Sequence, residues 1–387
     1  MPRKVMVLLM VFGALSALFL ADWTQEEGTA AAAGAIVLER PWEVIDVAIA
    51  LDTSGSMEYL IEAARLKLWA IVHDLSLLEP TPTLRVALLT FGNFKNHRDA
   101  GWVRVETDLT EDLDQVSERL FMLTSEGGTE YVGRVLKTAL QGLSWTPSEY
   151  PLKLVFVVGN EPADQDPTVS FREMAEAARD EGILVNAVFC GSGEHEDAAS
   201  WKEMAELADG QFATIDHRRR AVVVKTLFDE EIAELSTAIN DTYIPLGERG
   251  RQRRQKLAAQ DKNAKLLSPE AATSRAQVKT TRLYCVGWDL VDALDAGRVS
   301  LYDLEEQELP ENLRAMSFEE LEIYVAKMRG RREELRVQIA ELAEMRRQHV
   351  AAQINVKGLD DSMAFDTALR RVILERAEEK GFRPKKR

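Results

Sequence analysis

The chain has 387 residues, enough for one large domain or for a medium domain with a smaller accessory region. Apolar residues make up 46% and charged residues 29%, which permits a packed core and argues against a wholly disordered chain. The formal net charge of -16 repels phosphate backbones, so nucleic acid is excluded as the expected partner. Two cysteines, Cys190 and Cys285, are too few for a disulfide framework, and the sequence leaves open whether they pair or are two buried thiols.

The N-terminal residues have the pattern of an export signal. Arg3 and Lys4 precede an apolar run over residues 5–21, and a mostly polar stretch follows. The run is long for a signal core and short for a membrane span, so a cleaved signal peptide and an uncleaved membrane anchor both remain open. We therefore expect residues 1–24 to export the protein to the periplasm, the cell envelope or the medium. Residues 25–40 are Ala-rich and are expected to be a linker.

Short apolar runs alternate with amphipathic helices over residues 41–240. The expected strands are residues 44–51, 84–91, 102–107, 152–158, 183–189 and 212–215. The expected helices cover about 60–78, 110–120, 132–143, 170–182, 201–210 and 221–239. This alternation predicts a doubly wound, mostly parallel α/β sheet with helices on both faces. Such a sheet binds ligands at the C-terminal ends of its strands, so the site is expected after Leu51, Phe91 and Val158.

The strand pattern disappears after Asp241. Residues 241–275 are polar and charged, and they predict a helical or flexible connector. Residues 276–387 predict a C-terminal helical region, with enough apolar side chains before residue 302 for a small docking element.

A long helix is expected after Ser317, which forms a capping box with Glu320. Its apolar residues follow an alternating spacing of four and three, which is typical of a heptad seam. Arg332 and Arg346 interrupt this seam. A helical hairpin packed on the α/β domain and a helix that binds a partner are therefore both open, and so is the oligomeric state.

Asp52, Ser54 and Ser56 form a D-x-S-x-S motif between the first strand and the first helix. A sharp turn there would bring these alternate side chains to one point. A carboxylate and two hydroxyls are hard oxygen donors, which suit Mg²⁺, Mn²⁺ or Ca²⁺ better than zinc or copper. The adjacent helix N-terminus favours an incoming anion.

This motif resembles the metal-ion-dependent adhesion site of von Willebrand factor type A domains. A second family element, Gly127-Gly128-Thr129 at the start of a helix, is also present, and the resemblance covers roughly residues 44–220. It implies a doubly wound fold, Thr129 as a third hydroxyl ligand, and binding of a partner's carboxylate through the metal. The segment Trp288–Ala293 is similar to the C-terminal region of some bacterial cell-envelope proteins that contain such domains.

One element departs from the family pattern. The family places an Asp after a later strand, where this chain has Gly159 followed by Asn160 and Glu161. We expect Glu161 to be the substitute ligand, with Asn160 or Asp164 as alternatives. The missing carboxylate leaves open that Mg²⁺, Mn²⁺ or Ca²⁺ does not bind.

The expected function is that of an exported, non-enzymatic protein-binding module with a divalent metal. A hydrolase is disfavoured because Ser54 replaces the second acid of a D-x-D pair, and the chain has no convincing serine triad or P-loop. In a second hypothesis the protein is a metal-free scaffold that acts through its C-terminal helices. There, Ser54, Ser56 and Thr129 would only cap helices and fix turns.

Overall fold

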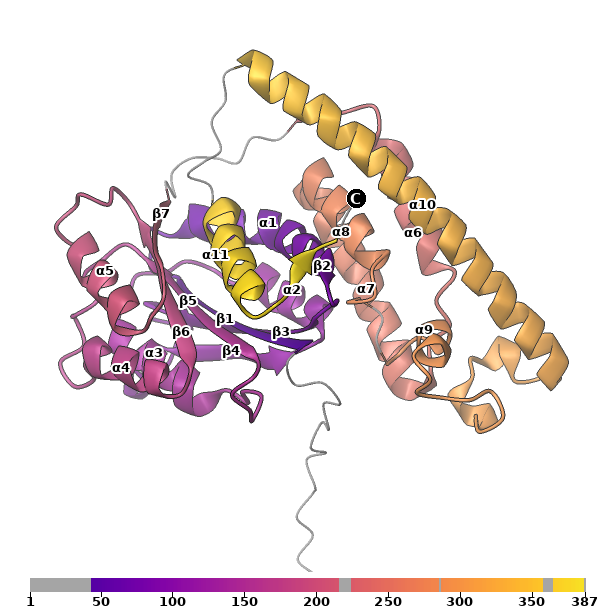
Figure 1. Ribbon diagram of the computed structural model, residues 1–387, viewed down its shortest axis with the longest axis horizontal. Coiled ribbons are helices and arrows are strands. Elements are labelled where there is room, and N and C mark those ends of the chain that lie inside the picture. Colours follow the sequence, from indigo (N-terminus) through magenta and orange to yellow (C-terminus); the bar gives the residue numbers. More distant parts are fainter. Residues whose placement is uncertain (1–42, 216–223, 285–286, 358–364, 386–387) are drawn as a thin grey trace, which may run out of the picture. The chain divides into compact units, whose positions relative to one another are not determined.

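The computed structural model of the protein describes residues 43–215, 224–284, 287–357 and 365–385 (Figure 1). Its main sheet has the strand order β4-β3-β1-β5-β6-β7. These strands are β1 (Val44–Asp52), β3 (Thr83–Phe91), β4 (Arg104–Thr110), β5 (Leu152–Gly159), β6 (Ile183–Cys190) and β7 (Phe212–Ile215). All pairs are parallel except β3 and β4, which confirms the predicted mostly parallel sheet.

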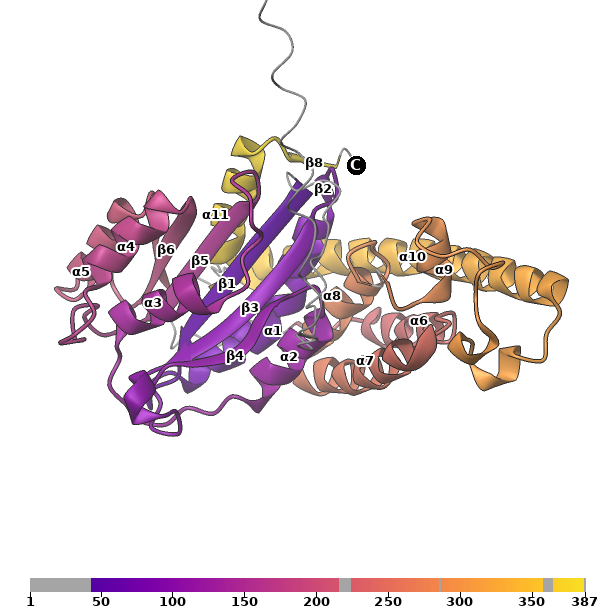
Figure 2. The same ribbon diagram turned by 90° about the horizontal axis from the view of Figure 1, so that it is seen from below.

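Helices cover both faces of this sheet (Figure 2). One face packs on α1 (Glu58–Ser76), α2 (Leu113–Met122) and α11 (Phe365–Glu379). The other packs on α3 (Val132–Gly142), α4 (Phe171–Asp180) and α5 (Ala198–Leu207). Strand β1 shows the alternation that produces these layers, since Ile45 and Val47 point to the first face while Ala48 and Ala50 point to the second.

Three predicted boundaries were wrong for local reasons. Strand β4 begins at Arg104 because the chain turns before it at Trp102, which has a φ of 61°. Helix α2 begins at Leu113 and not near residue 110, because the Asp112 side chain caps it by accepting from a backbone N–H. Helix α6 begins at Asp229, and residues 216–223 lie outside the described residues.

The predicted signal or anchor at residues 1–24 and the predicted linker at residues 25–40 also lie outside the described residues. None of the helices in the described ranges is long and apolar enough to cross a membrane.

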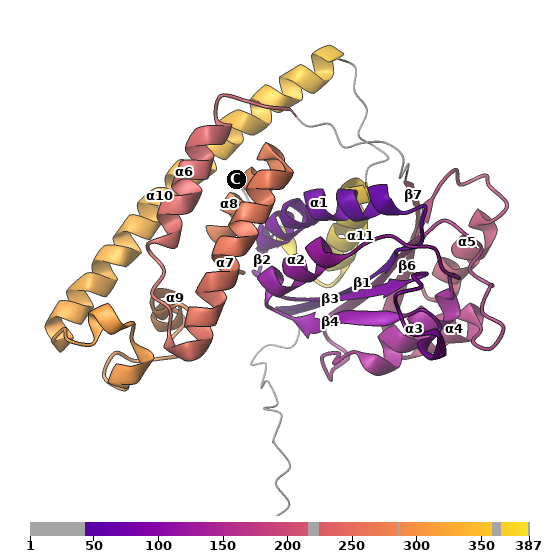
Figure 3. The ribbon, with the colours of Figure 1, turned by 180° about the vertical axis from the view of Figure 1, so that it is seen from behind.

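The C-terminal region is helical, and part of it packs on the α/β layers (Figure 3). The expected connector is mainly a helix, α7 (Gly247–Leu267), which contacts α2. Helix α8 (Pro269–Lys279) packs along α1, as does α11 from the other end of the chain. The remaining elements are β2 (Leu78–Glu79), η2 (Arg98–Ala100), α6 (Asp229–Asn240), α9 (Leu290–Asp295), η3 (Glu306–Glu308), η4 (Glu311–Leu313), α10 (Phe318–Lys357) and β8 (Arg383–Pro384).

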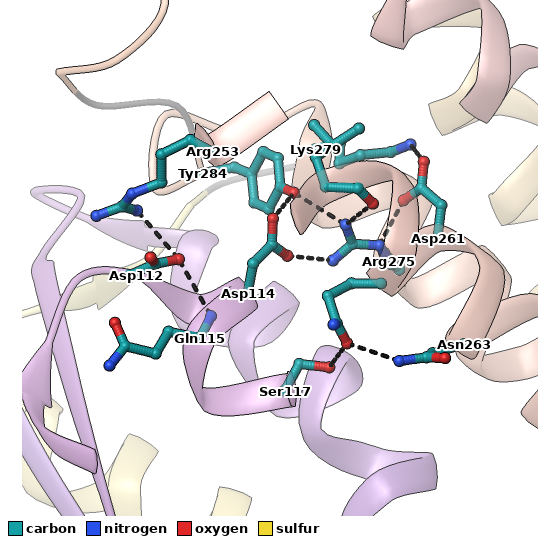
Figure 4. A network of polar contacts seen from close by, with 12 residues as sticks. Asp112, Asp114, Gln115, Ser117, Arg253, Asp261, Asn263, Arg275, Lys279 and Tyr284 are labelled. Carbon is teal, nitrogen blue, oxygen red and sulfur yellow. Dashed lines mark hydrogen bonds and ion pairs between the residues drawn. The ribbon is translucent and has the colours of Figure 1, made fainter. Parts of the chain in front are cut away.

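A buried polar network joins α2 to the C-terminal helices (Figure 4). The guanidinium of Arg275 in α8 bonds Asp114 of α2 at 2.7 Å and also bonds Asp261 of α7. Tyr284 donates to Asp114, and Lys279 donates to Asp261. Because these charges are paired across elements from both halves of the chain, the helical region is part of the same packed body as the sheet.

The heptad-like seam of α10 is buried inside this chain. Leu335 and Ile339 are fully buried against α6 residues, and Arg332 is only 1% exposed. Arg332 binds Asp289 and the backbone carbonyl of Thr242, so the predicted interruption of the seam is an anchoring side chain. Within the described residues, this packing favours the helical hairpin over a coiled coil with a partner.

Arg346 has the same role further along α10. It is buried and bonds the Asp229 carboxylate at 2.7 Å and the Val224 carbonyl at 3.2 Å. Asp229 is the first residue of α6, and its carboxylate also accepts from the backbone N–H of Thr226 in the preceding loop. Both arginines of the seam therefore attach α10 to α6 and its flanking loops.

Candidate metal site

The D-x-S-x-S motif lies where β1 ends and the chain turns into α1. Asp52 is fully buried, and its Oδ1 accepts from the backbone N–H of Ser54 at 2.7 Å, which holds the turn. The hydroxyls of Ser54 and Ser56 lie 3.4 Å apart, and Ser56 also donates to Asn160 Oδ1 at 3.4 Å. The structure therefore brings Asp52, Ser54 and Ser56 together with the loop after β5.

Neighbouring loops are tied to the same strand end. Thr53 donates its hydroxyl to the Phe91 carbonyl at 3.1 Å, which joins the ends of β1 and β3. The amide of Asn93 donates to the carbonyls of Thr53 and Thr124, and the Glu126 N–H donates to the Thr53 carbonyl. These bonds hold the loop before α3 against the motif, because a buried backbone carbonyl needs a donor.

Glu130 is a site residue that the sequence analysis missed. Its side chain is 1% exposed and lies against Asp52 beside Gly92. Burial, with the adjacent charge of Asp52, raises the pKa of Glu130 to about 10, and burial raises the pKa of Asp52 to about 6. The signal that could have pointed to it is its place directly after Gly-Gly-Thr, in a loop expected at the C-terminal edge of the sheet.

Several carboxylate oxygens of Asp52 and Glu130 have no hydrogen-bond donor. Oδ2 of Asp52 and both carboxylate oxygens of Glu130 are buried and accept no hydrogen bond within the described residues. No ion pair there joins either acid to a lysine, arginine or histidine. Buried carboxylates without a counter-charge are costly, whereas a hard divalent cation would bind such oxygens together with the nearby hydroxyls. The residues present therefore fit a divalent metal. Hydroxyl oxygens would have to complete the ligand set, because no group of three or more Asp, Glu, His or Cys side chains in the described residues is arranged to hold a metal ion.

The comparison with protein families agrees with this fold. Residues 46–230 match the family model of the von Willebrand factor type A domain. The matched segment, here called the VWA domain, runs from β1 to the start of α6. A comparison with curated proteins found no match.

Several solved structures resemble the VWA domain. Proximal thread matrix protein 1 from the mussel byssus, with a zinc-occupied adhesion motif, is 18% identical at a TM-score of 0.35, covering 44% of this chain and 41% of that one. A von Willebrand factor type A protein from Catenulispora acidiphila is 16% identical at 0.35, covering 44% and 38%. The manganese-loaded TRAP protein of Plasmodium vivax is 17% identical at 0.30, covering 43% and 63%. The chain thus spans less than half of the first two proteins.

Position 159, where the resemblance would place a second Asp, has little room for a side chain. A Cβ on Gly159 would lie 3.0 Å from the Trp201 ring and 3.4 Å from Asp52 Cβ. The Trp201 indole is fixed there, because its N–H donates to the Glu161 carbonyl at 2.7 Å. A larger residue at position 159 would therefore have to displace a buried tryptophan.

The other predicted ligands are less enclosed. Thr129 is half-buried beside Glu130. Glu161 is exposed, and its carboxylate accepts from Gln165 at 2.7 Å. Asp164 is exposed as well.

The hydroxyls of the motif do not serve as helix caps. Helix α1 has Met57 at its N-cap and α3 has Tyr131, and neither helix has a side-chain cap bond. Of the alternative in which Ser54, Ser56 and Thr129 only cap helices and fix turns, the helix-capping part therefore lacks its contact.

Proposed function

We propose that this protein is an exported, non-enzymatic binding module that holds a divalent cation at the end of β1 and engages an acidic side chain of a partner protein through it. One observation carries the proposal: two buried carboxylates, Asp52 and Glu130, face each other without a cationic partner among the described residues, beside two serine hydroxyls. The match of residues 46–230 to the von Willebrand factor type A family model supports the same chemistry.

Asp52, Ser54 and Ser56 would hold the ion, with Thr129 as a further hydroxyl ligand by resemblance. A divalent ion bound there supplies an electrophilic position that an incoming carboxylate can complete. Mg²⁺ or Mn²⁺ suits this donor set, and Ca²⁺ is the third candidate. The chain itself supplies the turn at Ser54 and the buried Asp52 carboxylate that orient the ligands.

The rim of the site has an exposed aromatic residue that suits a protein partner. Phe94 is 56% exposed, its N–H donates to the Gly127 carbonyl, and its ring packs edge-on against Trp102. Gly127 in turn lies next to Gly55 of the motif. A rigid aromatic next to a polar anchor is typical of the residues that dominate protein interfaces.

A metal-free scaffold is the second candidate. Helix α10 exposes four large apolar side chains among its described residues, Phe318, Ile323, Val337 and Met345, which could contact another protein without any ion.

Pull-downs from cell-envelope extracts, with and without chelator, test the proposal. The bait is the chain from residue 43 onward, because α8 and α11 cover α1 and a shorter piece would expose that face. We expect capture that chelator removes and that the Ser54→Ala/Ser56→Ala double variant loses. Ser192→Ala, in an exposed loop elsewhere, is the matched control. Capture by the double variant that equals capture by the parent chain, with or without chelator, favours the scaffold.

A further inference from the structure

We infer that Glu130 is a direct ligand of this metal, and that it supplies the second carboxylate which the family usually places at the position of Gly159. The inference rests on the proposed metal site and adds one ligand to it. It also replaces Glu161, the substitute expected from the sequence.

The first argument is contact. A Cβ on Gly92 would lie 2.9 Å from Asp52 Oδ1 and 3.0 Å from Glu130 Cγ, so both acids line the same glycine. Ser54 Cβ lies 3.5 Å from the same point. The Glu130 side chain therefore lies within the Asp52 and Ser54 cluster, on the side opposite Gly159.

The second argument is the cost of placing Glu130 there without a ligand. Its side chain is 1% exposed, and both carboxylate oxygens lack hydrogen-bond donors within the described residues. A glutamate at a loop position normally extends into water, where its charge is solvated. An ion shared with Asp52 would give the oxygens of both acids a partner.

The third argument is that the backbone directs Glu130 inward. Gly128 lies against the turn that follows β3, and a Cβ there would lie 2.4 Å from the Gly92 carbonyl oxygen, so only glycine permits this approach. The Glu130 carbonyl accepts from the Val132 N–H at 3.2 Å, which bends the chain just before α3. The loop is thus held close to the end of β3 at Gly128, two residues before Glu130.

The fourth argument is that Glu161 is poorly placed for the same role. Its carbonyl is held by the Trp201 indole, and its carboxylate is exposed and bonded to Gln165. The Trp201 ring also fills the space that a side chain at Gly159 would need. In this chain the second carboxylate therefore comes from the loop before α3 and not from the loop after β5.

Two carboxylate ligands balance the charge of a divalent ion. The ion then attracts an incoming acid less strongly than it would with hydroxyl ligands and a single carboxylate. We expect a partner that is released readily, and we expect its acidic residue to contribute less affinity than the apolar contacts around Phe94.

Manganese titration of the chain from residue 43 onward tests the inference, with free Mn²⁺ measured by electron paramagnetic resonance. Glu130→Gln should weaken Mn²⁺ binding at least about tenfold, since even outer-shell partners of a metal typically contribute 10–100-fold. Glu161→Gln and Glu126→Gln, an exposed glutamate of the same loop, should change it less than about twofold. Glu130→Gln keeps the shape of a buried side chain that no cation pairs among the described residues, so its metal-free melting temperature should not fall below that of the parent chain.

The outcomes separate the two proposals. If the parent chain binds Mn²⁺, Asp52→Asn abolishes binding and Glu130→Gln retains it, the metal site stands and the role of Glu130 is overturned. If Glu161→Gln produces the loss instead, the ligand expected from the sequence is restored. If the parent chain itself binds no Mn²⁺ or Mg²⁺, the proposed function fails together with the inference.

Discussion

Replacing Arg275 by Met should lower the free energy of unfolding by about 3–5 kcal/mol, the cost of breaking a buried ion pair from one side. Arg275 is 1% exposed and bonds Asp114 and Asp261, which belong to opposite halves of the packed body (Figure 4). After the substitution Asp261 keeps Lys279, while Asp114 keeps only the Tyr284 hydroxyl. The main penalty is therefore one buried carboxylate without a counter-charge.

A second contribution comes from the ring contacts of the guanidinium. Its carbon lies 4.5 Å from the Trp69 ring centroid and 5.5 Å from that of Tyr284. Desolvated contacts of this kind contribute up to about 2 kcal/mol. Methionine retains the packing volume but not the charge, so it recovers only part of this contribution.

Urea unfolding followed by tryptophan fluorescence and circular dichroism measures the loss. Arg172→Met is the control, because Arg172 and Glu203 form an ion pair whose side chains are 46% and 42% exposed, and such pairs contribute less than about 1 kcal/mol. Asp114→Asn added to Arg275→Met should restore part of the stability, since it removes the unpaired charge. The reasoning is refuted if Arg275→Met and Arg172→Met unfold at the same urea concentration with the same slope.

Three further substitutions test other parts of the fold. Arg332→Met should cost about 3–5 kcal/mol in thermal or urea unfolding, because it leaves the fully buried Asp289 without its guanidinium, and a loss below about 1 kcal/mol would contradict this role. Gly128→Ala should weaken Mn²⁺ binding, measured by calorimetry, because its Cβ would clash with the Gly92 carbonyl; unchanged affinity would show that the loop tolerates the shift. Burial lowers the pKa of Lys279 to about 8, below the value of about 10.4 in unfolded chains, so the unfolded state binds more protons between these pH values. The stability of the parent chain relative to Lys279→Met should therefore rise from pH 8 to pH 10, and a constant difference would argue against a depressed pKa.

The sheet could be predicted because its strands are continuous apolar runs that need no information from distant residues. Strand β5, for example, is almost entirely buried, and its expected and observed bounds differ by one residue. The convergence of Asp52, Ser54 and Ser56 could also be predicted, because a sharp turn after β1 brings alternate side chains of neighbouring residues together. Helix boundaries such as that at Asp229 depend on local side-chain bonds, which the periodicity does not contain.

Glu130 and Arg332 could not be assigned from the sequence. Periodicity treats a charged residue as a solvated position or as an interruption, whereas both side chains are buried through contacts with residues 78 and 43 positions away. Their surroundings exist only once β1 meets the loop before α3, and once α10 meets the segment before α9. Burial of a charge is therefore a tertiary property here, and a single sequence does not reveal it.

Helix α11 has a consequence for the order in which the chain can fold. Its residues Leu369, Val372 and Ile373 are buried in the same core as the first strand, and β8 pairs with β2. A growing polypeptide therefore presents α1 without its full cover until α11 has left the ribosome. Early chain termination would leave that apolar face open to chaperones and proteases even though the entire VWA domain had been synthesised.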